Sequence, residues 1–224
     1  MPGGAKDHSL IGVNPNIITW RQVRRERNFL IQFFIVVGVI LLVVSILPFY
    51  FHAVIGPKPG IQLNDIVLNV FSPQDHSWII FGLIYVSLLI TLQGTGRKPI
   101  VILLGLKCYL LITLLRMTTM YVFTLNPPNG IIALHDPIVD VIAYGGTVFN
   151  KDLFFSGHVA SLTLFVLLEE RPFFRKILIL NTLIVAGLLL LQRVHYTIDV
   201  IFAPLMVMGV FRLTKNNFQI RVKS

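Results

Sequence analysis

Two short polar signatures bound the stretch 151–199, which decides the fold: Asp152-Leu-Phe-Phe-Ser156-Gly157-His158 at its start and Arg193-Val-His195-Tyr196-Thr197-Ile-Asp199 at its end. Between them lie two apolar runs, separated by a charged turn at 169–176. Apolar runs joined in this way predict a helical hairpin in a membrane. The two signatures then share one membrane face, to which they bring two histidines and an aspartate.

The composition indicates a membrane protein. Of the 224 residues, 55% are hydrophobic and 13% are charged, and the mean hydropathy is +0.78. Soluble domains usually contain about a quarter charged residues, and so apolar a chain would expose large greasy patches in water. The net charge of +9 would favour nucleic-acid binding in a soluble protein, but most Lys and Arg residues stand beside apolar spans. Orientation in the bilayer explains them better, so no nucleic-acid partner is expected.

Cysteine usage and residue spacing give no sign of a metal or cofactor. The single cysteine, Cys108, excludes a disulfide within the chain and a zinc site built from cysteines. Because Cys108 falls in an apolar run, a small packing residue is the favoured interpretation. No group of residues has metal-ligand spacing, so we expect neither a metal nor another cofactor.

The apolar runs predict an all-α polytopic membrane protein with six transmembrane helices. The expected spans are Phe29–Tyr50, Ser77–Leu92, Ile100–Leu115, Phe154–Leu168, Ile177–Leu191 and Ile198–Leu213. Several are shorter than the roughly 20 residues that an isolated helix needs, which we attribute to polar site residues at one helix end. The six-helix catalytic domain covers 29–213, between a basic N-terminal segment at 1–28 and a basic tail at 214–224.

Two connections have more than one interpretation. The piece at 61–71 fits either a short interfacial helix or a plain loop. The semi-apolar piece at 131–144 fits a re-entrant or an interfacial segment. The third span can continue as helix beyond Leu115 towards Leu125.

The basic residues predict which side of the membrane each connection faces. With six spans, both termini and two turns share one side, which carries most of the positive charge: Arg21, Arg24, Arg25, Arg27, Arg97, Lys98, Arg171, Arg175, Lys176 and the basic tail. The opposite connections hold only Lys58, Arg116, Lys151 and Arg193. Positively charged loops stay cytoplasmic, so the expected topology is N-in and C-in. The polar signatures and Arg116 then lie on the non-cytoplasmic face, whether lumenal, extracellular or periplasmic.

Each signature has a chemical and a structural interpretation. His195 and Asp199 are four residues apart, so on a helix the carboxylate can orient the imidazole for nucleophilic attack. The alternative is an aspartate favoured by the helix dipole beside an interfacial histidine. In Ser156-Gly157-His158, glycine admits a close phosphate and a helix N-terminus attracts anions, whereas the alternative is a plain serine N-cap. Their joint occurrence at one membrane face favours a phosphoryl-transfer site.

Four further polar residues belong either to this site or to the ordinary membrane surface. Arg116 can bind a phosphate bidentately, or extend its charge to the interface. Tyr196 can stack on a quaternary ammonium head group, or belong to an aromatic belt. Asp152 fits the site or a solvated loop equally well. Lys107 lies well inside a span, where an ammonium needs a partner or water, and the sequence indicates no partner.

The signatures resemble the type 2 phosphatidic acid phosphatase superfamily and, more narrowly, its sphingomyelin synthase-like branch. Three stretches carry the resemblance: Arg116-Met-Thr-Thr-Met120-Tyr-Val-Phe-Thr-Leu-Asn-Pro-Pro128, Asp152-Leu-Phe-Phe-Ser156-Gly-His158 and His195-Tyr-Thr-Ile-Asp199-Val. The superfamily's first motif, lysine followed by Arg-Pro, is absent, and Leu189 stands where the third motif has arginine. These departures agree with the synthase branch rather than with an ordinary lipid phosphatase. Asn150-Lys151 replace the usual Cys-Gly of that branch.

The resemblance implies a lipid phosphotransferase in which His195 is the nucleophile, Asp199 orients it and His158 is the general acid and base. A phosphohistidine would carry the head group from a glycerophospholipid to a lipid hydroxyl such as that of ceramide. The substrate-binding residues expected beside them are Arg116, Asp152, Ser156, Gly157 and Tyr196.

Two other functions stay open from the sequence. One is a lipid phosphate or pyrophosphate phosphatase, with water as the acceptor. The other is a non-enzymatic transport or structural subunit that uses Lys107 and the histidines as polar pathway residues. The expected partners are membrane lipids, and the sequence leaves a homo-oligomer open.

Overall fold

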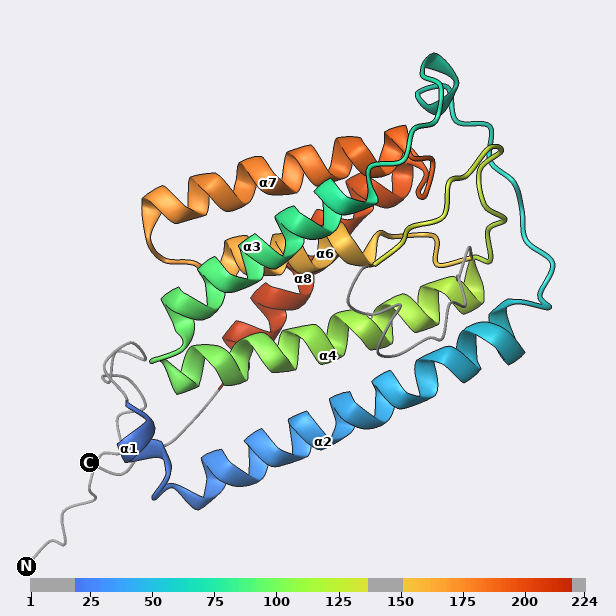
Figure 1. Cartoon of the computed structure of the whole chain (residues 1–224). Coiled ribbons are helices and arrows are strands. Elements are labelled where there is room, and N and C mark those ends of the chain that lie inside the picture. The colour runs from blue at the N-terminus through green and yellow to red at the C-terminus, as the bar shows by residue number, and fades with distance from the viewer. Residues whose placement is uncertain (1–18, 137–150, 219–224) are drawn as a thin grey trace, which may run out of the picture.

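A computed structural model describes residues 19–136 and 151–218. The regular secondary structure of the described residues is all-helical apart from one isolated bridge between Ile61 and Leu125. The helices are α1 (Trp20–Val23), α2 (Arg27–Phe49), a π-helical continuation η1 (Tyr50–Ile55), a 3₁₀ turn η2 (Leu68–Val70), α3 (Ser77–Thr95), α4 (Pro99–Val122), α6 (Gly157–Leu168), α7 (Pro172–Leu191) and α8 (Thr197–Asn216) (Figure 1).

Five helices are long and apolar enough to cross a membrane: α2 with its continuation to Ile55, α3, α4, α7 and α8. They overlap five of the six expected spans, because a long uncharged run can bury its backbone polar groups in lipid only as a helix. The third helix runs on to Val122, so Arg116 lies within α4 rather than in the connection after it.

The fourth expected span, Phe154–Leu168, differs from the prediction. Its helix, α6, has only 12 residues and therefore extends about 18 Å, well short of the hydrocarbon thickness of about 30 Å. The helix begins at Gly157 because Ser156 caps it, and residues 152–156 approach it without helical structure. The described residues thus hold five candidate spans and one short apolar helix.

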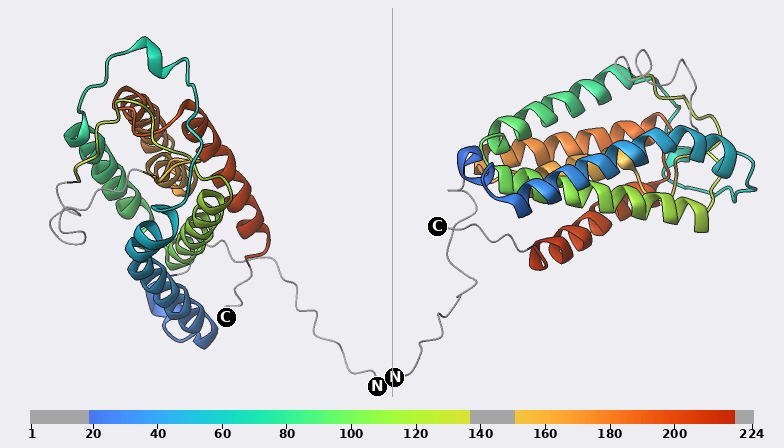
Figure 2. Two further views of the ribbon diagram at one scale, coloured as in Figure 1. Left: turned by 90° about the vertical axis from the view of Figure 1, so that its right-hand side faces the viewer. Right: turned by 90° about the horizontal axis from the view of Figure 1, so that it is seen from below.

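The short helix α6 is the centre of the bundle. It packs against α3, α4, α7 and α8, while α2 lies at the outside and packs against α4 (Figures 1 and 2). No residue of α6 is exposed, and Val159, Leu162, Thr163 and Leu164 are buried. A helix that is apolar all round is suited to such a central position.

The ends of the helices sort the polar residues into two groups. At one end, on the right in Figure 1, α4 and α7 finish and α3, α6 and α8 begin. The connections at this end, 56–76, 123–136, 151–156 and 192–196, are called the loop layer below. At the opposite end, Trp20 Nε1 donates to the Gly96 carbonyl at 2.8 Å and Lys98 pairs with Glu170 at 2.5 Å. Both signatures therefore lie at one end of the bundle.

The structure describes the first of the two ambiguous connections fully and the second in part. The piece at 61–71 is a loop with the 3₁₀ turn η2, not an interfacial helix. Of the piece at 131–144, only 131–136 is among the described residues, and it is loop.

Lys107 has the partner that the sequence did not reveal. Its Nζ donates to Oε1 of Gln32 on α2 at 2.6 Å, and it lies 4.9 Å from the centre of the Phe218 ring. The ammonium thus joins α4 to α2.

Candidate active site

The pair His195 and Asp199 is buried at the start of α8. Nδ1 of His195 lies 3.3 Å from Oδ2 of Asp199, and the two residues are 1% and 0% exposed. The same carboxylate oxygen accepts the backbone N–H of Tyr196 at 3.1 Å, so it also caps the helix. A proton on Nδ1 that is donated to this carboxylate leaves the Nε2 lone pair free to react. The contact and the cap fit both interpretations of this signature, and nucleophilic attack by His195 stays a prediction.

The second imidazole, that of His158, lies beside the first. The ring centres of His158 and His195 are 6.3 Å apart at an interplanar angle of 63°. The other neighbour of the His158 ring is Phe81, at 5.7 Å between ring centres. Among the described residues, the buried Nδ1 of His158 has no hydrogen-bond partner. The two imidazoles are therefore neighbours at the starts of α6 and α8.

A backbone hydrogen bond connects the two signatures directly. The N–H of Ser156, at the start of α6, donates to the carbonyl of Asp199 in α8 at 3.1 Å. Ser156 is fully buried, and its Oγ accepts the N–H of Val159 at 3.4 Å as an N-cap. The serine therefore sets both the first turn of α6 and its position against α8.

Arg116 approaches the histidines from α4 and pairs with Asp152. Its Nη2 donates to both carboxylate oxygens, and the two side chains are 19% and 29% exposed. Burial is the largest single influence and raises the pKa of the Asp152 carboxyl, but the Arg116 charge and hydrogen bonds together with the two neighbouring histidines hold the pKa below its ordinary value. Nε of Arg116 is buried and, within the described part of the chain, has no partner.

The Arg116 guanidinium occupies the space that a side chain at position 157 would need, so only glycine fits there. A β-carbon on Gly157 would overlap the Arg116 guanidinium, coming within 2.7 Å of Nη2. The glycine of the signature thus gives the guanidinium its place against the N-terminus of α6. An anion held there would meet a positive side chain and the positive end of a helix together.

Phe154, in the middle of the first signature, has a strained backbone. Its φ is 91°, a conformation that rarely suits a residue with a side chain and costs on the order of 1–3 kcal/mol. Its ring stacks on Phe123 with ring centres 4.6 Å apart, while its neighbours Leu153 and Phe155 are each 1% exposed. Buried residues on both sides hold the strained turn between Asp152 and the start of α6.

Tyr196 directs its hydroxyl towards the other connections of the loop layer. Its hydroxyl donates to the Asn126 carbonyl at 2.9 Å and accepts the N–H of Leu63 at 3.2 Å. The side chain is 1% exposed. This hydroxyl fixes the chain directly after His195 to two connections, and contact with a head group stays a prediction.

Sequence reasoning did not find the role of Arg193, which follows the end of α7. Its φ is 57°, the left-handed conformation that a helix end usually gives to glycine. The N–H groups of Arg193 and Val194 close the helix on the carbonyls of Leu190 and Leu189, each at 3.0 Å. Its guanidinium donates to three further backbone carbonyls at 2.8 to 3.0 Å, those of Asn129, Leu68 and Phe71. A positive charge beside a helix end was visible in the sequence, but its three acceptors lie in distant loops.

A comparison with family models agrees with this geometry. Residues 151–217 match the model described as PAP2 superfamily C-terminal. This part of the chain is similar to the C-terminal region of PAP2 superfamily proteins. Proteins of the PAP2 superfamily are typically enzymes that act on lipid phosphates. The PAP2 match includes both histidine signatures, whereas Arg116 and the loops before residue 151 lie outside it. A comparison with curated proteins found no match.

Proposed function

We propose that this chain is a lipid phosphotransferase that moves a phospho-head group from a glycerophospholipid to a lipid hydroxyl, such as that of ceramide, through a phosphohistidine. The observation that supports this most is the arrangement of two neighbouring imidazoles, of which one is held by a buried carboxylate. The match of residues 151–217 to the PAP2 superfamily supports lipid phosphates as the substrate class.

In the first half-reaction, Nε2 of His195 attacks the phosphorus of the donor lipid. The new N–P bond forms as the P–O bond to diacylglycerol breaks, and protonated His158 gives its proton to the departing oxygen. Asp199 stabilises the positive charge that develops on the imidazole of His195. Diacylglycerol then leaves, and the head group remains on His195.

In the second half-reaction, neutral His158 removes the proton of the acceptor hydroxyl. The acceptor oxygen attacks phosphorus, the N–P bond breaks, and His195 regains its lone pair. His158 ends protonated, as it began, so atoms and protons balance over the cycle. One residue serves as acid and then as base, which fits a site with two imidazoles and one orienting carboxylate.

The phosphate oxygens would be held where Arg116 meets the N-terminus of α6. The guanidinium of Arg116 lies against Gly157, and Asp152 fixes its orientation. Ser156 accepts the N–H groups of Val159 and Ala160, so the N–H groups of Gly157 and His158 are the ones left for an anion. Positive donors placed before the reaction begins stabilise the charge of the transition state.

Burial of the site favours transfer over hydrolysis. His195 is 1% exposed and Ser156 is 0% exposed, so little water reaches the proposed nucleophile. The expected charge distribution supports a location on the non-cytoplasmic face, since the site lies at the bundle end opposite Arg97 and Lys98. Membrane lipids are then the donor and the acceptor.

Purified protein in vesicles tests the proposal. With a labelled glycerophospholipid and ceramide, we expect diacylglycerol and a new head-group lipid in equal amounts, and a labelled phosphoenzyme without acceptor. His195→Ala should abolish both, and His158→Ala should lower the rate by about 10²–10⁴-fold. His52→Ala, which changes an exposed histidine outside the site, is the matched control and should keep full activity.

Two results would contradict the proposal. Undiminished transfer by His195→Ala would exclude this histidine as the nucleophile. Release of inorganic phosphate from phosphatidic acid, without transfer to any lipid hydroxyl, would show a phosphatase instead.

A further inference from the structure

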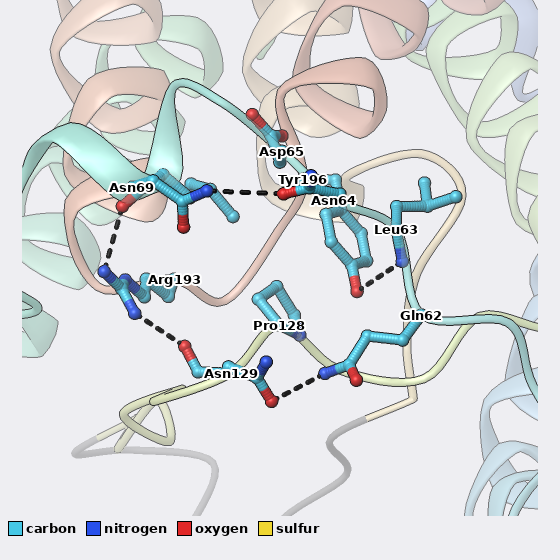
Figure 3. Close-up of a pocket in the computed structure, with 10 residues that line it drawn as sticks. Gln62, Leu63, Asn64, Asp65, Asn69, Pro128, Asn129, Arg193 and Tyr196 are labelled. Atoms are coloured by element: carbon cyan, nitrogen blue, oxygen red, sulfur yellow. Dashed lines mark hydrogen bonds between the residues drawn. The ribbon is translucent and has the colours of Figure 1, made fainter.

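A polar cavity of about 260 Å³ lies in the loop layer, beside the histidine site (Figure 3). Its walls come from 62–69, from Pro128 and Asn129, and from Arg193 and Tyr196, which flank His195 in the chain. Sites for drug-sized molecules have about 300–1,000 Å³, so this volume suits one small group rather than a whole lipid. Figure 3 shows Arg193 and Asn69 on one side, and Tyr196, Leu63 and Gln62 on the other.

The charged groups of the cavity are already occupied. Both carboxylate oxygens of Asp65 accept hydrogen bonds from Thr197, and one of them also accepts the N–H of Val67. Both terminal nitrogens of Arg193 donate to backbone carbonyls. An ammonium group would therefore have to share Asp65 with Thr197 and Val67, and a phosphate would have to share the Arg193 guanidinium with three backbone carbonyls. The lining also carries one positive and one negative charge, which favours a neutral ligand.

The remaining hydrogen-bonding groups are a mixture of donors and acceptors. Nδ2 of Asn69 donates to Oδ1 of Asn64 at 3.3 Å, and Nε2 of Gln62 donates to Oδ1 of Asn129 at 2.8 Å. These four residues are exposed, and the second polar atom of each amide has no partner among residues 19–136 and 151–218. The cavity thus offers two donor groups, from Asn64 and Asn129, and two acceptors, from Asn69 and Gln62.

We propose that this cavity binds a neutral polyhydroxylated group, a sugar or polyol ring. Each hydroxyl both donates and accepts, so a ring with several hydroxyls can satisfy amide nitrogens and amide oxygens at once. The ligand is either a free sugar or polyol or the head group of a glycolipid, and its binding does not depend on the phosphotransfer proposed above.

Ligand-observed NMR on the full chain in phosphatidylcholine nanodiscs tests this site. The probes are myo-inositol and methyl α-glucoside, compared with choline and inorganic phosphate. We expect the two polyhydroxylated probes to bind and the charged probes not to compete. Asn129→Ala and Asn69→Ala should each weaken binding about five- to tenfold, the effect of about one hydrogen bond.

Matched controls separate this site from the histidines. Gln93→Ala removes an amide at the opposite end of the bundle and should leave binding unchanged. His195→Ala should also bind the probes normally, since the imidazole does not line the cavity. If nanodiscs that contain a glycosyl diacylglycerol displace methyl α-glucoside, the source is a lipid head group, and without displacement it is a free sugar or polyol.

Three results would overturn the inference: no binding of either polyhydroxylated probe, competition by choline or phosphate, or affinities unchanged in both Asn129→Ala and Asn69→Ala. Thermal unfolding of each variant keeps these results interpretable. A variant that unfolds is replaced by Asn129→Asp or Asn69→Asp, which keep the shape and one acceptor. Loss of phosphotransfer with normal probe binding would contradict the proposed function and leave this inference standing.

Discussion

Asp65 and Thr197, 132 residues apart, are joined by two hydrogen bonds at the start of α8. The backbone N–H of Thr197 donates to Oδ2 of Asp65 at 2.6 Å, and its hydroxyl donates to Oδ1 at 3.0 Å. Asp65 belongs to the connection between α2 and α3, so a distant loop supplies a cap for the helix that carries Asp199. The position of the His195–Asp199 pair therefore depends on a residue outside the region that matches the PAP2 family.

Asp65→Ala is expected to loosen the start of α8. Loss of a helix cap costs about 0.5–2 kcal/mol, so thermal unfolding should occur at a lower temperature. The rate of transfer should fall more than the affinity for the donor, because His195 would be misplaced rather than the lipid released. Asp65→Asn keeps one acceptor oxygen and should recover part of both losses. A parallel loss in kcat and in affinity would contradict a positioning role.

Gly157→Ala is expected to displace Arg116. The added β-carbon overlaps the guanidinium, so Arg116 must leave Asp152 and the N-terminus of α6. Displacement of a group that orients the reacting phosphate by about 1 Å can cost about 10²-fold in rate, which assays of transfer would detect. Gly187→Ala is the matched control, because a β-carbon there meets no described atom within 4 Å. Equal activity of the two variants would show that Arg116 does not bind the phosphate.

Substitutions of Arg193 should separate backbone strain from hydrogen bonding. Both Arg193→Ala and Arg193→Gly lose the three carbonyl contacts, so both should be less stable than the original chain. Glycine adopts the left-handed conformation freely, whereas alanine does not, which is worth about 1 kcal/mol. Denaturant unfolding in detergent should therefore find Arg193→Gly more stable than Arg193→Ala. The reverse order would mean that the left-handed backbone at Arg193 is not strained.

The stability of the protein should depend on the charge of Asp152 in acid. Burial raises the folded-state pKa of this carboxyl, but the Arg116 charge and hydrogen bonds together with the two neighbouring histidines bring it below its ordinary value. A depressed pKa adds stability that is fully present above the unfolded pKa of about 3.9 and is lost as the pH falls through the folded pKa. The melting temperature should therefore fall on acidification below about pH 5.

Asp152→Asn is the test of that pH dependence. It removes the titrating group, so the melting temperature should be lower at neutral pH and should change less on acidification. Asp65 and Asp75, whose pKa values are also lowered by hydrogen bonds, keep their own part of the dependence. An unchanged acid profile in Asp152→Asn would show that the Arg116 pair contributes nothing to stability.

Much of the bundle was predictable because lipid leaves an apolar chain few choices. Five uncharged or nearly uncharged runs became helices near their expected bounds, since each backbone polar group must find its partner within the helix. The prediction was wrong for the length of α6, which begins at Gly157 within the first signature. The apolar run starts at Leu153, but Ser156 caps the helix and the strained turn at Phe154 precedes it. A hydrophobic pattern reveals neither the cap nor the strained turn.

Some contacts of the polar residues could also be predicted from the sequence, and others could not. The closeness of His158 and His195 could be predicted, because the two signatures stand at the two ends of a single helical hairpin. Spacing also indicated the contact between His195 and Asp199, because i and i+4 share a helix face. The partner of Lys107 could not be predicted, since Gln32 lies 75 residues away on a helix whose rotation only packing decides.

The sequence alone determined the membrane class, five spans and the two histidine signatures, because hydrophobicity and helical spacing act over a few neighbouring residues. Only the tertiary structure decided that Asp65 caps α8, that Arg193 binds three carbonyls and that a polar cavity lies beside His195. Each of these contacts joins loops far apart in the chain. Their formation depends on how the helices pack and orient their ends, and no local pattern encodes that.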